Sequence, residues 1–198
     1  MGIAFDPTDN KENPDVYFTA SFLFHKGTQS TSGTSVNGQI RRASCPPFRT
    51  VITVVSGLQV LDLDHSLNAM EFGDMGELYF SSGSNTNGGE PGPLSISRLL
   101  KENFLSAGIN VAYFSHPDFN GRITWSALED GNMIAVGVEP YAMGLRNPFS
   151  VLLHSNEKLY ATDNGPNVGY GKMRKGCGPN EVVNDIQAPD EFVPQTLF

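Results

Sequence analysis

The chain has 198 residues, a formal net charge of −8 and a sequence pI near 4.9. This acidity argues against nucleic-acid binding, which usually requires a basic surface, and no apolar run approaches the roughly 20 residues of a membrane span. The 21 glycines and 13 prolines favour a turn-rich β protein over a helical one.

Three segments share one pattern, in which an apolar strand, a polar turn and a second strand with a central tyrosine follow one another. They are residues 2–21 (GIAFDPTDNKENPDVYFTAS), 69–84 (AMEFGDMGELYFSSGS) and 150–165 (SVLLHSNEKLYATDNG). Each turn contains Asn, Asp, Gly or Pro, the residues that adopt the backbone conformations of hairpin turns. The pattern therefore predicts three β-hairpins.

A second element follows the first two hairpins. Residues 36–44 (VNGQIRRAS) and 119–127 (FNGRITWSA) both place Asn-Gly two residues before an isoleucine, a signal for a hairpin or the start of a strand. We expect the two segments to be equivalent strands of successive units. Residues 95–108 (SISRLLKENFLSAG) are compatible with one short helix or an irregular strand.

The recurrence of a unit with several strands predicts a β-propeller of four-stranded blades, whereas hairpins alone would also suit a sandwich or another barrel. Propellers close with 4–8 blades, and about three units here correspond to half of a six-bladed ring. We expect residues 1–198 to form a single partial propeller domain, truncated at both ends. Such a fold brings the leading ends of its innermost strands to one central face.

Two polar pairs occupy the leading ends of matching strand patterns. Asp64 and His65 precede the second hairpin, while Arg146 and Asn147 precede the third. Histidine titrates near neutral pH and can act as a general base; a surface-loop histidine beside acidic neighbours is the alternative. The arginine fork matches carboxylates and quinone oxygens, and Pro148 fixes the backbone after Asn147. A loop arginine paired with an acid is the alternative there.

Two further loops are candidates for ligand contacts. Residues 162–167 (TDNGPN) form a Gly-Pro turn whose carbonyl oxygens are suitable ligands for a hard cation such as calcium. Glu181 and Asp185, further along the chain, are candidate carboxylate ligands. Residues 82–89 (SGSNTNGG) lack the helix context of a phosphate-binding loop, so we expect them to form a loop over one face.

The order GIAFDP, DHSLNAMEFGDMGELYFSSGS and GLRNPF…LYATDNGP resembles the soluble quinoprotein glucose/sorbosone dehydrogenases over residues 2–185. The resemblance implies a six-bladed propeller that binds pyrroloquinoline quinone and calcium. It assigns the general base to His65, cofactor contacts to Asp64, Arg146 and Asn147, and calcium ligation to the carbonyls of Gly165 and Pro166. In this chain the acidic cluster that usually follows the Gly-Pro turn is displaced.

The function that this resemblance implies is oxidation of an aldose or pyranose sugar at its anomeric carbon by hydride transfer to the quinone. The partners would be the sugar and an external electron acceptor, with no nucleic acid and no membrane span. The full-length protein would be secreted and extracellular. The competing interpretations are a non-catalytic propeller that binds a protein or glycan partner on the same face, and a non-functional fragment.

Overall fold

The computed structural model describes residues 2–21, 36–44, 48–60, 65–86, 101–127 and 132–165, together with a strand at 191–196. The regular structure of these residues is all β, with no α-helix, which confirms the all-β part of the predicted fold class. They contain no helix long and apolar enough to cross a membrane.

The first sheet has four antiparallel strands in sequence order. They are β1 (Ile3–Phe5), β2 (Val16–Ala20), β3 (Gly38–Ala43) and β4 (Val51–Leu58). The first predicted hairpin is the pair β1–β2, in which Ala4 lies opposite Tyr17. Residues 36–44 supply β3, as their Asn-Gly signal predicts.

The second sheet also has four antiparallel strands, in the order β5, β6, β7, β10. Their bounds are Leu67–Phe72, Leu78–Ser82, Gly108–Ala112 and Val138–Met143. The second predicted hairpin is the pair β5–β6. Every residue of β6 and β7 is buried, because this sheet is covered on both faces.

The expected equivalence of residues 36–44 and 119–127 is wrong. The second segment contains β8 (Thr124–Ala127), which pairs with β9 (Asn132–Ile134) in a separate two-stranded sheet. The third strand of the second sheet is β7, and residues 101–107 before it form turns and bends rather than a helix or strand. Residues 87–100, which include the first part of the segment 95–108 that was expected to form a short helix or an irregular strand, lie outside the described residues.

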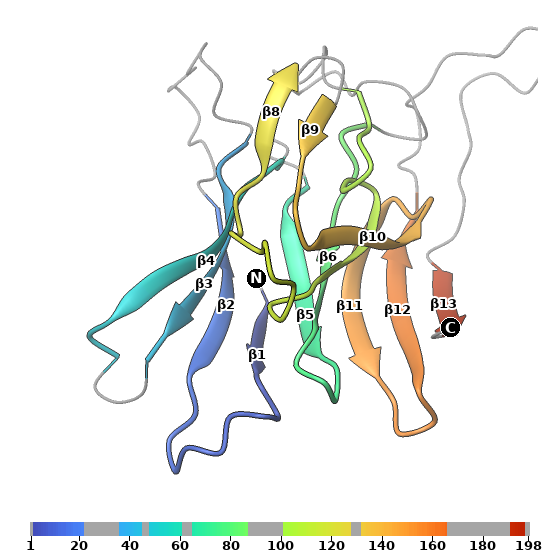
Figure 1. The fold of residues 1–198 in the computed structure, drawn as a ribbon. Helices are drawn as coiled ribbons and strands as arrows, with labels where there is room; N and C mark the ends of the chain where they lie inside the picture. Colours follow the sequence, from blue (N-terminus) through green and yellow to red (C-terminus); the bar gives the residue numbers. More distant parts are fainter. Residues whose placement is uncertain are drawn as a thin grey trace, which may run out of the picture.

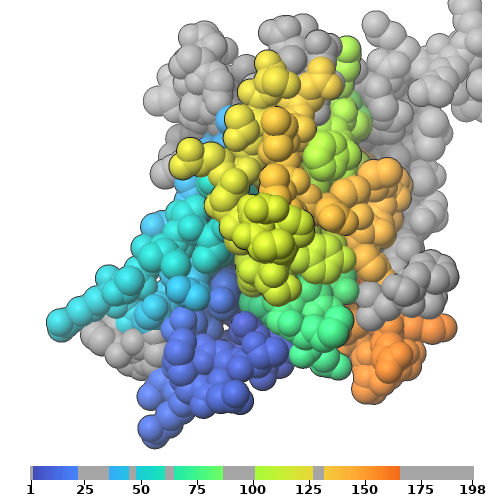
Figure 2. Space-filling model, viewed as in Figure 1, coloured from blue at the N-terminus to red at the C-terminus, as the bar shows by residue number. Residues whose placement is uncertain are grey.

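The segment between β7 and β10 connects the first two sheets. Ser56 of β4 donates its backbone N–H to the carbonyl of Gly121 and accepts from the N–H of Ile123. The indole Nε1 of Trp125 donates to the carbonyl of Gly57 at 2.8 Å. Figure 2 shows this segment, in yellow, lying over the junction of the blue and cyan first sheet with the green second sheet.

The third sheet contains β11 (Asn147–Leu153), β12 (Lys158–Asn164) and β13 (Glu191–Thr196) in that order. Its hairpin β11–β12 is the third predicted one. The three sheets stand side by side, with β1, β5 and β11 as neighbouring strands (Figure 1).

Two hydrophobic clusters hold the sheets together, one on each face of the second sheet. Phe80 and Leu78 of β6 belong to the cluster shared with the first sheet, which includes Ile40 and Val55. The cluster shared with the third sheet comprises Tyr79, Ile109, Val111, Ala142, Val151, Leu159 and Ala161. Complete burial of a side chain such as Phe80 contributes roughly 2–3 kcal/mol to the stability of the fold. Because successive side chains of β6 point to opposite faces of the sheet, β6 packs against both neighbouring sheets.

Candidate functional site

The beginnings of β1, β5 and β11 meet at one end of the sheets. Gly2 lies against the backbone of Asn68, so closely that an added Cβ would collide with the Asn68 carbonyl. Asn68 in turn donates from Nδ2 to the Asn147 side-chain oxygen at 2.8 Å and to the Pro148 carbonyl at 3.0 Å. We call Gly2, His65, Asn68, Arg146 and Asn147 the leading-end cluster.

His65, the predicted general base, is 4% exposed. Its Nδ1 lies 2.8 Å from the Ser84 carbonyl oxygen and 3.2 Å from the Ser84 hydroxyl oxygen. A carbonyl can only accept, and the Ser84 hydroxyl donates its own hydrogen to the Thr86 carbonyl at 2.5 Å. Nδ1 therefore carries the hydrogen in the neutral ring, which makes Nε2 the basic nitrogen.

His65 and Asn147 both pack closely against the backbone at Gly83. A Cβ at residue 83 would lie 2.5 Å from the His65 Cβ and 2.8 Å from the Asn147 side-chain oxygen. The next residue, Ser84, donates its N–H to the Arg146 carbonyl at 2.7 Å. The structure therefore brings His65 together with Arg146 and Asn147 through residues 83 and 84.

Asp163 of β12 fixes the backbone at the start of β11. Its carboxylate is 8% exposed and accepts from the N–H of Arg146 at 2.9 and 3.1 Å and from the N–H of Asn147 at 2.8 Å. Hydrogen bonds to an ionised carboxylate are stronger than neutral ones. Asp163 thus orients both candidate cofactor-binding residues through their main chain.

The side chains of Arg146 and Asn147 differ in how they are engaged. Nη1 of Arg146 donates to the Gly165 carbonyl at 2.9 Å. Asn147 accepts from Asn68 through Oδ1, whereas its Nδ2 hydrogen-bonds to none of the described residues. Because Asn68 fixes which end of the amide is which, Asn147 presents N–H donors to a ligand with acceptor oxygens.

A second buried polar group adjoins the cluster through the chain after Ser84. Glu102 accepts from the backbone N–H groups of Asn85 at 3.0 Å and Thr86 at 2.8 Å. Gln59 accepts through Oε1 from Asn85 Nδ2 at 2.6 Å and from Asn103 Nδ2 at 2.5 Å. Of the predicted loop over a face, Ser82, Ser84, Asn85 and Thr86 are therefore buried, whereas Gly83 is half-buried.

A quinone and a calcium ion fit the described residues to different degrees. The amide of Asn147 and the guanidinium of Arg146 are donors, which suits quinone and carboxylate oxygens. The Gly165 carbonyl accepts from Arg146, so a cation bound to this oxygen would be next to a guanidinium. Within the described ranges no three His, Cys, Asp or Glu residues gather to hold a metal. These residues fit the quinone, but do not by themselves form a calcium site.

Several residues singled out from the sequence lie outside the described residues. They are Asp64, Pro166, Glu181 and Asp185. The cofactor contact of Asp64 and the calcium ligation by Pro166 therefore stay predictions.

Sequence reasoning missed Gly83, Ser84, Asn68 and Asp163. Asp163 lies in the Thr162–Asn167 turn that was singled out for its carbonyls, and Gly83 and Ser84 lie in the polar loop 82–89, but in neither case did the sequence indicate the role of the residue. No protein-family model matches the chain, and no curated protein matches it at a significant level. The leading-end cluster and the order of the sequence motifs are therefore the features that bear on function.

Proposed function

We propose that this chain carries the base and part of the cofactor face of a quinone-dependent sugar dehydrogenase built on a β-propeller. The single observation that carries the proposal is the convergence of His65, Arg146 and Asn147 at the beginnings of neighbouring strands. These residue types, in the motif order DH, GLRNP and TDNGP, are what the resemblance implies for sugar oxidation by pyrroloquinoline quinone. The full protein would be a secreted enzyme with six blades, of which this chain supplies about three.

Proton removal is the role of His65 in this proposal. Because Nδ1 donates to Ser84, Nε2 is the nitrogen that accepts the proton of the sugar's anomeric hydroxyl. Pyrroloquinoline quinone, when bound, supplies the acceptor for the hydride that leaves the same carbon. The sugar loses one proton and one hydride and becomes the lactone, and an external acceptor takes the electrons.

Binding and orientation are the roles of Arg146 and Asn147. The arginine provides positive charge and a planar fork, and the asparagine provides an amide oriented by Asn68. Asp163 keeps both residues at the start of β11, so their side chains do not have to be ordered when a ligand arrives. Calcium ligation by the Gly165 and Pro166 carbonyls is implied by the resemblance alone, because the described residues do not by themselves form a calcium site, and no step of the reaction is assigned to calcium.

The direct test is reconstitution of the protein that contains this chain with pyrroloquinoline quinone and calcium. Dye reduction is then measured with a panel of aldoses, and cofactor binding is followed by the change in its absorbance spectrum. The proposal predicts sugar-dependent dye reduction. A spectral change on binding without turnover of any sugar would favour the non-catalytic binding module. Absence of both would refute the enzyme proposal.

A further inference from the structure

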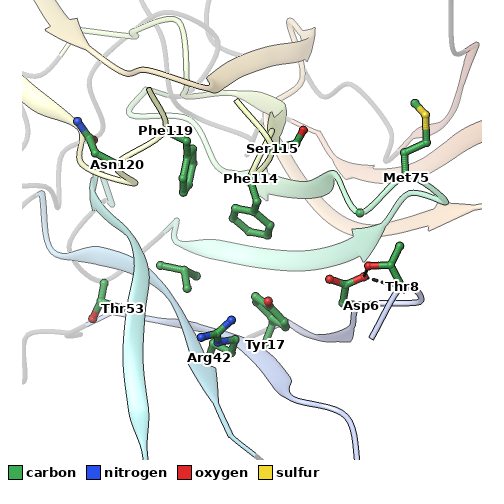
Figure 3. A pocket seen from close by; sticks show the side chains of 12 residues that line it. Asp6, Thr8, Tyr17, Arg42, Thr53, Met75, Phe114, Ser115, Phe119 and Asn120 are labelled. Carbon is green, nitrogen blue, oxygen red and sulfur yellow. Dashed lines mark hydrogen bonds between the residues drawn. The ribbon is translucent and has the colours of Figure 1, made fainter. Parts of the chain in front are cut away.

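A cleft of about 600 Å³ lies between the first sheet and the loop that follows β7. Tyr17, Arg42 and Thr53 form one wall, and Phe114 and Phe119 face them from the loop (Figure 3). The remaining lining residues are Asp6, Thr8, Val54, Met75, Gly76, Ser115 and Asn120. The volume lies within the range of small-molecule sites, roughly 300–1,000 Å³.

This cleft is separate from the leading-end cluster. The turn between β5 and β6 supplies Met75 and Gly76 to the cleft, whereas His65 precedes the opposite end of β5. No residue of the leading-end cluster lines the cleft. A ligand in the cleft would therefore not be the molecule held by His65 and Arg146.

Tyr17 provides a fixed polar group in the cleft. The residue is 6% exposed, and its ring contacts Phe72 edge-on at 4.9 Å and stacks on Phe114 at 5.9 Å, centroid to centroid. Its hydroxyl hydrogen-bonds to none of the described residues, and it points into the cleft (Figure 3). Because the hydroxyl of a buried tyrosine usually finds a partner, this group is suited to a ligand.

Arg42 stands beside Tyr17, since the two residues are opposite each other in the register of β2 and β3. Its Nε lies 3.5 Å from the Asp15 carboxylate, which Lys11 also pairs at 3.0 Å. Asp6 is the one acid and Arg42 the one base among the residues that line the cleft, Arg42 is next to the Asp15 carboxylate, and the whole chain is acidic. This balance disfavours an anionic ligand in spite of the arginine.

The cleft combines hydrogen-bond donors with acceptors. Arg42 donates, and Asp6 accepts through Oδ2, because Oδ1 is already held by the N–H and hydroxyl of Thr8 at 2.8 and 2.7 Å. The Thr53 hydroxyl donates to Gln39 Oε1 at 3.5 Å and can accept from a ligand. A ligand hydroxyl both donates and accepts without charge, so it satisfies donors and acceptors together.

The apolar part of the cleft is aromatic. Phe114 and Phe119 are half-buried and meet edge-to-face at 5.2 Å, so their positions are mutually fixed. The C–H faces of a sugar ring can pack on such aromatic surfaces while its hydroxyls reach the opposite wall. We propose that this cleft binds a neutral saccharide, as a second site distinct from the leading-end cluster.

The test is titration of the folded protein with maltose, cellobiose and diacetylchitobiose, with benzoate as an anionic probe, by ligand-observed NMR and calorimetry. At least one disaccharide should bind more tightly than benzoate. Tyr17→Phe keeps the ring and removes the hydroxyl, and should weaken binding about 2–10-fold by losing one hydrogen bond. Thr53→Val, at an exposed position of β4, should weaken it in the same direction.

One control variant locates the effect. Tyr160→Phe in β12 removes a hydroxyl that lies outside the cleft lining and should leave saccharide binding unchanged. The proposal is overturned if no disaccharide binds, if benzoate binds more tightly than every disaccharide, or if neither Tyr17→Phe nor Thr53→Val weakens binding. Because Tyr17 and Thr53 line the cleft and do not belong to the leading-end cluster, weaker binding by their variants reports on the cleft, whether or not the protein oxidises sugars.

Discussion

Replacement of Gly83 by alanine should disturb the leading-end cluster. The added Cβ would lie 2.5 Å from the His65 Cβ and 2.8 Å from the Asn147 side-chain oxygen. Carbon atoms in contact are normally about 3.5–4.0 Å apart, so His65 must move by about 1 Å. Asn147 cannot easily yield, because Asn68 holds its oxygen.

Overpacking of this kind costs about 1–3 kcal/mol of unfolding free energy. For a chain of this length each kcal/mol lowers Tm by about 2–4 °C, so the expected decrease is about 2–12 °C. Thermal and urea unfolding measure it. Gly73→Ala is the matched control at the other end of β5, where the atoms nearest to the new Cβ belong to the carboxylate of Glu77, at the end of a flexible side chain. Equal stability of the two variants would refute the reasoning.

Three further substitutions test the contacts around the site. Asp163→Ala should cost about 2–4 kcal/mol of unfolding free energy, because two buried N–H groups lose their acceptor; a loss below about 0.5 kcal/mol in urea unfolding would contradict this. Asn68→Asp should destabilise the fold at neutral pH, where a carboxylate faces the oxygens of Asn147 and Pro148, and should recover once acid protonates it; a pH-independent effect would argue against it. Glu71→Gln should raise stability at neutral pH, since burial raises the pKa of the Glu71 carboxyl. The Glu71 carboxyl therefore binds its proton more tightly in the folded state than in the unfolded state. The ionised carboxylate destabilises the fold at a pH above the raised pKa, and this destabilisation disappears below the usual pKa of 4.5. Urea unfolding at one pH above the raised pKa and one below 4.5 should show that Glu71→Gln gains stability only at the higher pH.

The hairpins could be predicted because their signals are local. The turn at Asp74–Gly76 carries its own chemistry in the sequence, and so does the turn around Asn156. β7 was missed because all five of its residues are buried, which removes the alternation that marks a half-buried strand. β8 was assigned to the wrong sheet because an Asn-Gly signal marks where a strand begins and not which strand it pairs with.

The residues of the candidate site also divide into those that the sequence indicates and those that only the structure reveals. His65, Arg146 and Asn147 were found because their residue types suggest chemistry and because they occupy matching places in a repeat. Gly83 and Ser84 act through a missing Cβ and a main-chain carbonyl, which only tertiary placement reveals.

The most direct test of the proposed function compares the intact protein with its His65→Ala variant after loading with pyrroloquinoline quinone and calcium. Both proteins are mixed with an aldose that supports turnover, and reduction of the bound quinone is followed by absorbance. We predict that both bind the cofactor to a similar extent and that only the protein with His65 reduces it at a measurable rate. Equal reduction rates in the two proteins would contradict the assignment of His65 as the base.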